Sequence, residues 1–215
     1  MISEDRLLAE ELFLLAWDHD VGKARSTVSV QLPAAVGGAL LLELALRDRL
    51  RMEENVPRAS SRPTGDPLLD AVAAQVRDGS RRRKLRSWVR RIGTTGTRDE
   101  VRDRLVDRGV LVPAEQRILG IVPVTRYRAA DPAEVERLAD GVRAVLVGGQ
   151  PADDRAAALA ALVGATAVLD KLVPRSERRA ARARAKELAE ATPVAAAVRD
   201  VIRGTQAAII TSASN

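Results

Sequence analysis

The longest apolar stretch of the chain lies within residues 32–52, and Glu43 is the single charged residue before its arginine-rich end. A helix that is apolar on all sides has no face for solvent, so it lies inside a protein or in a membrane. A bilayer span needs about 20 apolar residues, and this run is shorter. We therefore predict a buried central helix that begins near Pro33. Gly37 and Gly38 lower its helix propensity, which predicts that a neighbouring helix crosses closely there.

The rest of the chain is predominantly helical by its apolar periodicity. Apolar side chains recur at helical spacing, flanked by capping and stop signals such as Asp66 before Pro67. Short strands are expected over residues 23–30 and 51–56, and loops over residues 57–67 and 94–96. The spacing predicts helices over residues 3–17, 66–79, 81–92, 98–108, 131–147, 151–163, 168–173, 174–190 and 193–210.

A β-hairpin is expected after Gly109, where residues 110–112 and 116–127 read as extended chain. Pro123 restricts this chain to an edge strand or a bend. Together these elements predict a mainly α fold, a single-domain helical bundle over residues 1–215 around a buried central helix, with a protruding β-hairpin. The predicted tip of the hairpin is apolar and consists of Leu119, Gly120, Ile121 and Val122.

The composition excludes several kinds of active site. The chain has no cysteine and a single histidine, His19, so disulfides, thiolate metal sites and histidine-based triads cannot form. Asp18-His19-Asp20 is better explained as a polar turn than as a metal site, and no phosphate loop or dinucleotide fingerprint occurs. We therefore expect no enzyme activity, no metal and no cofactor. The N-terminus lacks a signal-peptide pattern, which favours a cytoplasmic protein.

The charge pattern indicates an anionic partner. The formal net charge is +6, and nearly all the positive charge is arginine, whose planar guanidinium suits phosphate. Basic residues of the segments 81–91 and 98–108 flank one short loop, so their charges are expected to converge. Paired charges on solvated helix faces would account for about half of these arginines. The candidate head-group ligands are Arg98, Arg102, Arg81, Arg82 and Arg90.

An apolar tip beside a basic surface is typical of a reversible membrane binder. Each basic residue near an anionic leaflet adds about 1 kcal/mol of binding free energy. A few inserted apolar side chains add roughly 25 cal/mol per Å². Neither contribution anchors a protein firmly alone, but the two combine. The alternative for the tip is an oligomer contact or ordinary core packing.

Four motifs in order resemble the Golgi phosphoprotein 3 family, and the resemblance covers residues 7–209. They are LLLELALRDRL at residues 40–50, PTGDPLLD at 63–70, WVRRI at 88–92 and RLVDRGVL at 104–111. The composition, rich in arginine and alanine, resembles that of actinobacterial members. The resemblance implies a helical domain around a buried helix, with a protruding hairpin that supports membrane contact and oligomerisation.

The resemblance also implies ligands. Eukaryotic members bind phosphatidylinositol 4-phosphate and the cytosolic tails of glycosyltransferases. The tryptophan and arginine that they use near the central helix correspond to Val28 and Gly37 here. Two further arginines of their lipid site correspond to Thr95 and Arg98, so Arg98 alone keeps its type. Binding to anionic phospholipid in general is therefore the expectation.

Taken together, the sequence predicts a peripheral membrane protein on the inner face of the membrane, with acidic phospholipid head groups as ligand. The protein is expected to form homo-oligomers through the hairpin and to act as an adaptor for cytosolic tails of membrane enzymes. A different class remains open: residues 98–128, a helix followed by a hairpin, also describe a winged-helix module that binds nucleic acid.

Overall fold

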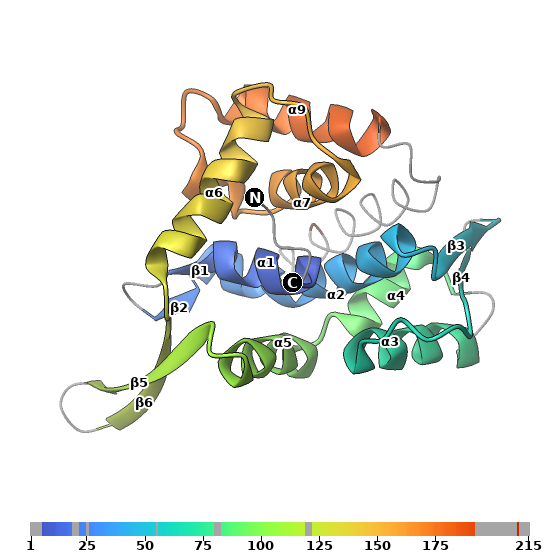
Figure 1. Cartoon of the computed structure of the whole chain (residues 1–215), viewed down its shortest axis with the longest axis horizontal. Helices are drawn as coiled ribbons and strands as arrows, with labels where there is room; N and C mark the ends of the chain where they lie inside the picture. Colours follow the sequence, from blue (N-terminus) through green and yellow to red (C-terminus); the bar gives the residue numbers. More distant parts are fainter. Residues whose placement is uncertain are drawn as a thin grey trace.

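The computed structural model describes residues 6–18, 22–24, 26–54, 56–79, 83–118, 122–191 and 210. Within these ranges the chain forms nine helices and three separate two-stranded antiparallel sheets, which confirms the mainly α prediction (Figure 1). The helices are α1 (Leu8–Ala16), α2 (Ser26–Leu46), α3 (Pro67–Asp78), α4 (Leu85–Ile92), α5 (Thr95–Asp107), α6 (Pro132–Leu146), α7 (Asp154–Gly164), α8 (Leu169–Leu172) and α9 (Arg178–Ala191). The paired strands are β1 (Trp17–Asp18) with β2 (Lys23–Ala24), β3 (Leu50–Glu53) with β4 (Val56–Ala59), and β5 (Leu111–Ile118) with β6 (Val122–Ala129).

Helix α2 is the buried centre of the molecule, as the apolar run predicts. It packs against α1, α3, α4, α5 and α7. Its residues 28–46 have the length and composition of a membrane span, but 78% of that window is buried inside the protein. Helix α2 is therefore the core helix around which the described part of the chain is arranged.

The predicted start of α2 is wrong, because the helix begins at Ser26 and Pro33 lies inside it. The predicted strand over residues 23–30 is accordingly limited to β2. Val28 and Leu32 are four residues apart, so a helix places both on one face. Their side chains are only 3% and 1% exposed. Burial of this face outweighs the weak alternation that suggests a strand.

The close crossing predicted at Gly37 is present. A Cβ atom on Gly37 would lie 2.5 Å from the backbone nitrogen of Gly93 and 2.6 Å from the carbonyl oxygen of Val89. A Cβ on Gly93 would in turn lie 2.4 Å from the carbonyl oxygen of Pro33. The end of α4 therefore packs backbone to backbone against α2, and this contact fixes the loop that leads into α5.

Buried carboxylates join three helices of the core. Glu43 of α2 is 2% exposed and accepts hydrogen bonds from the Leu8 backbone nitrogen at 2.8 Å and from Arg47 Nε at 2.9 Å. Arg155 of α7 bridges Glu43 and Glu11, with Nη1 3.0 Å from Glu43 Oε2 and Nη2 3.1 Å from Glu11 Oε2. The lone charge in the apolar run therefore ties α1, α2 and α7 together.

Glu11 makes the stability of the protein depend on pH. Burial raises the pKa of Glu11 to about 7 from an ordinary 4.5; Arg155 lowers it and Glu43 raises it further. Because the folded state holds this proton more tightly than the unfolded state, folding stability falls as pH rises from about 4.5 to about 7. The expected loss is about 3 kcal/mol. Urea titrations at pH 5 and 8 should show this difference, and Glu11→Gln should abolish it. An equal decrease in the variant would contradict the assignment to Glu11.

The hairpin of β5 and β6 projects from the body of the protein at the end of α5 (Figure 1). Eight residue pairs are in register, from Leu111 opposite Ala129 to Ile118 opposite Val122. Pro123 pairs with Arg117 in a sheet of only two strands, so it occupies an edge as expected. The protruding hairpin is thus confirmed in its two strands.

Candidate membrane-binding site

Three of the four aromatic residues of the chain meet where the β5–β6 hairpin joins the body. Phe13 and Trp17 stack with ring centroids 4.8 Å apart, and Trp17 meets Tyr127 of β6 edge-on at 6.3 Å. Trp17 Nε1 also donates a hydrogen bond to the Tyr127 carbonyl oxygen at 2.8 Å. These contacts fix the hairpin to α1 and β1, so the direction in which it projects is held by packing.

Arg98 and Arg102 reach the same place from α5. They are four residues apart and share a helix face. Helix α5 begins earlier than predicted, because Thr94 caps it by accepting a hydrogen bond from the Thr97 backbone nitrogen at 3.1 Å. Residues 95 and 96, expected in a loop, form its first turn. The guanidinium carbon of Arg102 lies 4.9 Å from the Tyr127 ring centroid, in a cation–π contact.

These side chains surround a hollow of about 170 Å³, which we call the hairpin foot. It lies between α1, α2 and α5. Its lining combines three charged groups of α5 with one hydroxyl and apolar groups of α1, β1 and α2. The lining residues are Phe13, Trp17, Ser29, Leu32, Arg98, Asp99 and Arg102.

The arginines of the hairpin foot are paired with aspartates. Arg98 Nη2 lies 2.6 Å and Arg102 Nη1 3.1 Å from Asp99 Oδ1, and Arg102 Nη2 lies 2.7 Å from Asp103. Partial burial lowers the pKa of Arg102. Its hydrogen bond to Asp103 and its electrostatic interactions with Tyr127 and Asp99 raise the pKa by more, so Arg102 stays a cation. Partly exposed ion pairs contribute about 0–1 kcal/mol. An incoming phosphate therefore competes with Asp99 at little cost.

The structure brings together only part of the predicted head-group site. Arg98 and Arg102 both line the hairpin foot, whereas Arg90 is exposed on α4 and lines no part of it. Arg81 and Arg82 lie outside the described residues. Helix α4 is amphipathic as expected, with Leu85, Trp88, Val89 and Ile92 buried and the arginines outside.

The predicted hairpin tip is described only at one end. Val122 is the first residue of β6 and pairs with Ile118. The other predicted tip residues, Leu119, Gly120 and Ile121, lie outside the described residues. Their role in membrane or oligomer contact therefore stays a prediction.

The structure also explains two of the positions that the family resemblance implies. Gly37 lies against the Gly93 backbone, which leaves no room for any larger residue, arginine included. Val28 is buried in the core, so it presents nothing to a ligand. Thr95 is exposed in the first turn of α5, one turn from Arg98.

The sequence reading missed Phe13, Trp17, Tyr127 and Asp99. The first two are more than 100 residues from Tyr127 along the chain, so no local spacing joins them. The available signal was the scarcity of aromatic residues, which make up 2% of the chain. Trp and Tyr combine a large apolar ring with a hydrogen-bonding group, which suits a site that is partly apolar and partly polar. Asp99 is adjacent to Arg98 in sequence, but its residue type does not distinguish it from Asp103 and Asp107 of the same helix.

The fold and the site define a class of protein: a mainly helical protein built around a buried helix, with a projecting β-hairpin and two ion-paired arginines at the base of that hairpin. The chain belongs to the Golgi phosphoprotein 3 family (GPP34), whose family model matches residues 8–205. No curated protein matches the chain.

Proposed function

We propose that the protein is a non-enzymatic peripheral membrane protein that binds acidic phospholipid head groups at the hairpin foot. Arg98 and Arg102 contact the phosphate at the base of the β5–β6 hairpin, and the tip at its far end enters the membrane interface. The membrane is the inner, cytoplasm-facing leaflet, which is rich in anionic lipid. The observation that supports this most is the position of two phosphate-competent arginines at the base of a hairpin with an apolar tip sequence.

The neighbouring charges of α5 favour lipid over nucleic acid. The nucleic-acid alternative requires Arg98, Arg102 and Arg104 to point outward, where they would contact phosphates. Arg104, however, is directed to the core side, where Nη2 lies 2.6 Å from Asp66 and Nε 3.3 Å from the buried Glu10. Val101 and Leu105 face inward as expected. Binding of membrane-enzyme tails and self-association through the hairpin stay predictions from the sequence.

Liposome flotation tests the proposal. Vesicles of phosphatidylcholine alone are compared with vesicles that contain an added anionic phospholipid, at low and at physiological salt. The protein should float only with the anionic vesicles and should bind less at higher salt. Equal recovery with both vesicle types would contradict the proposal. A steep, salt-dependent gel shift with duplex DNA and no flotation would instead favour the nucleic-acid alternative.

Single-charge variants at the hairpin foot should change vesicle binding in opposite directions. Arg98→Gln removes a cation and should weaken binding to anionic vesicles about fivefold, whereas Asp99→Asn removes the competing carboxylate and should strengthen it by about as much. Sedimentation of labelled vesicles gives both partition coefficients. Arg137→Gln, at an exposed arginine of α6, is the matched control. If it weakens binding as much as Arg98→Gln does, net charge rather than this site governs binding.

A further inference from the structure

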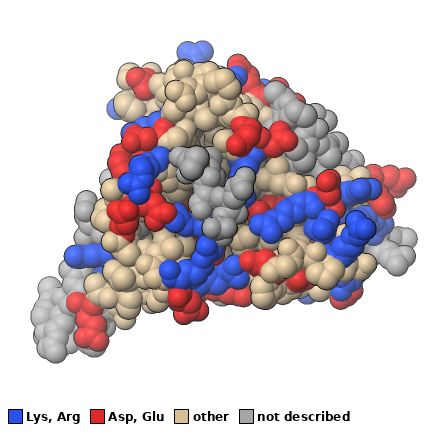
Figure 2. Space-filling view, viewed as in Figure 1, with Lys and Arg blue, Asp and Glu red and all other residues tan. Residues whose placement is uncertain are grey.

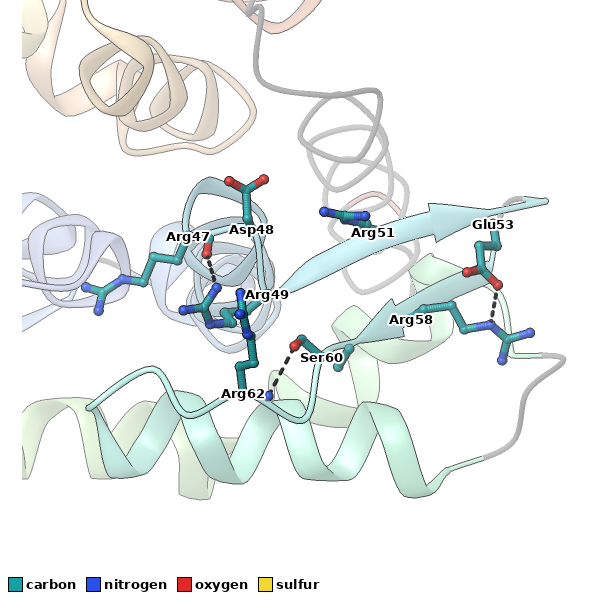
Figure 3. A pocket seen from close by; sticks show the side chains of 9 residues that line it. Arg47, Asp48, Arg49, Arg51, Glu53, Arg58, Ser60 and Arg62 are labelled. Carbon is teal, nitrogen blue, oxygen red and sulfur yellow. Dashed lines mark hydrogen bonds and ion pairs between the residues drawn. The ribbon is translucent and has the colours of Figure 1, made fainter.

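A second basic site lies at the end of the molecule opposite the β5–β6 hairpin (Figure 1). There a cleft of about 540 Å³ opens between the end of α2, the β3–β4 hairpin and the chain that follows it (Figure 3). We call it the arginine cleft. Figure 2 shows Lys and Arg side chains gathered over the same end of the protein. The cleft is lined by Arg47, Arg49, Arg51, Arg58 and Arg62, together with Asp48 and Glu53.

The alternation of β3 and β4 places these charges on one face. Residues 51 and 53 point away from Leu50 and Met52, because successive side chains of a strand point to opposite faces. Leu50 and Pro57 are buried and hold the other face against the protein, whereas Arg51 and Glu53 are exposed. The hairpin thus has an apolar inner face and a charged outer face that forms one wall of the cleft.

Two of the arginines are directly opposed across the strands. Arg51 and Arg58 are partners in the β3–β4 register. Side chains at such positions have Cβ atoms about 4.5–5.5 Å apart, and like charges there are destabilising. Glu53 relieves Arg58 alone, at 3.1 Å from its Nε. An anion bound over this face, near both guanidiniums, would offset the remaining repulsion.

The other arginines are mostly unneutralised. Arg49 donates to two backbone carbonyl oxygens, of Arg47 at 3.1 Å and of Pro63 at 3.5 Å. For Arg51 and Arg62 the described part of the chain provides no carboxylate partner within ion-pair distance. Arg47 pairs with the core carboxylate of Glu43 and Arg58 with Glu53, so the cations of Arg49, Arg51 and Arg62 are the ones left for a ligand. Three guanidiniums around one cleft form a phosphate-binding environment.

The turn that positions the cleft is itself unusual. Helix α2 ends with the Arg49 nitrogen donating to the Leu44 carbonyl at 2.7 Å and the Asp48 nitrogen to the Ala45 carbonyl at 3.1 Å. This is a Schellman motif, in which a glycine usually takes the left-handed position. Here Asp48 takes it, with a φ of 54°. The motif turns the chain so that Arg47 and Arg49 both reach the cleft.

We propose that the arginine cleft binds a multiply phosphorylated, non-aromatic small molecule of the inositol- or sugar-phosphate class. The cleft volume falls in the range of small-ligand sites, about 300–1,000 Å³, and exceeds what one phosphate needs. No aromatic side chain lines it, so it offers no stacking surface for a nucleobase. Several guanidiniums spread over its walls match several phosphates on one compact ring. This site is separate from the hairpin foot and does not rest on the proposed membrane function.

Calorimetric titration with inositol hexakisphosphate tests the proposal, with sulfate at equal ionic strength as the competitor. Wild-type protein should bind the probe with one-to-one stoichiometry, and Arg51→Gln/Arg62→Gln should weaken binding at least about tenfold. The matched control is Arg86→Gln/Arg179→Gln, which removes two exposed charges elsewhere and should change affinity less than about twofold. Asp48→Asn keeps a residue that tolerates a positive φ and should tighten binding about threefold.

The outcomes separate the possible sources of the phosphates. Binding of the soluble probe, but no cleft-dependent binding to vesicles with a bisphosphorylated inositol lipid, identifies a soluble ligand. If Arg51→Gln/Arg62→Gln, in which Arg98 is intact, loses binding to the soluble probe and also to these vesicles, the ligand is a lipid head group. Absence of probe binding, or an equal loss in the two double variants, would overturn the proposal. Unchanged melting temperatures of all variants exclude unfolding as the cause.

Discussion

Replacing Arg155 with methionine is expected to lower the free energy of unfolding by about 3–5 kcal/mol at pH 8. At that pH Glu11 is above its raised pKa and is ionised, and Arg155 is the side chain that bridges it to Glu43. Removal of Arg155 leaves the buried carboxylate of Glu11 without this ion pair, next to a second carboxylate in the core. Urea denaturation followed by circular dichroism measures the change.

The pH dependence of this variant provides its own control. Below the raised pKa of Glu11, protonation removes the charge of this carboxylate, so the cost of Arg155→Met should be smaller at pH 5 than at pH 8. Arg143→Met removes a partly exposed arginine that pairs with the exposed Glu136 and Asp140, and should cost less than about 1 kcal/mol. Similar losses in both variants would show that the bridge does not hold the core.

Gly37→Ala is expected to destabilise the protein by about 3 kcal/mol, the upper end of the range for overpacking. The added methyl group would lie 2.5 Å from the Gly93 nitrogen, and neither backbone can withdraw without shifting α2 or α4. Thermal unfolding of the two proteins gives the difference.

A second helical glycine gives the matched control. Gly141 of α6 has no atom within 4 Å of the place where its Cβ would lie. Gly141→Ala should therefore stabilise the protein by about 0.5–1 kcal/mol through helix propensity alone. If both substitutions shift the melting temperature in the same direction, the close crossing at Gly37 is not what makes glycine necessary.

The central helix, the hairpin strands and most helix ends follow from local patterns in the sequence. An apolar run, the capping pair Asp66–Pro67 and the glycine after α5 each act through neighbours within one turn. The start of α2 does not, because Val28 becomes buried only through contacts with distant helices. There tertiary packing outweighs the local alternation and tolerates Pro33 inside the helix.

The sites were less accessible from sequence than the fold. Charge indicates Arg98 and Arg102, but the aromatic residues beside them come from α1, β1 and β6, far away in the sequence. The sequence predicts a strand over residues 51–56 and a loop from residue 57, so the β3–β4 hairpin that forms one wall of the arginine cleft is predicted only in part. The chain turns toward the cleft at Asp48, which adopts a conformation that glycine usually provides. No pattern of residue types signals that turn.

The position of the hairpin foot on the bilayer can be measured directly. Because the chain contains no cysteine, a single introduced cysteine takes one fluorescent label at a known place. Labels at Thr125→Cys, exposed on β6, and at Ala183→Cys, exposed on α9, report the two sides of the molecule (Figure 1). Vesicles of brominated anionic lipid should quench the label at position 125 and leave that at 183 unchanged. Quenching at position 183 without quenching at 125 would contradict the proposed membrane-binding surface.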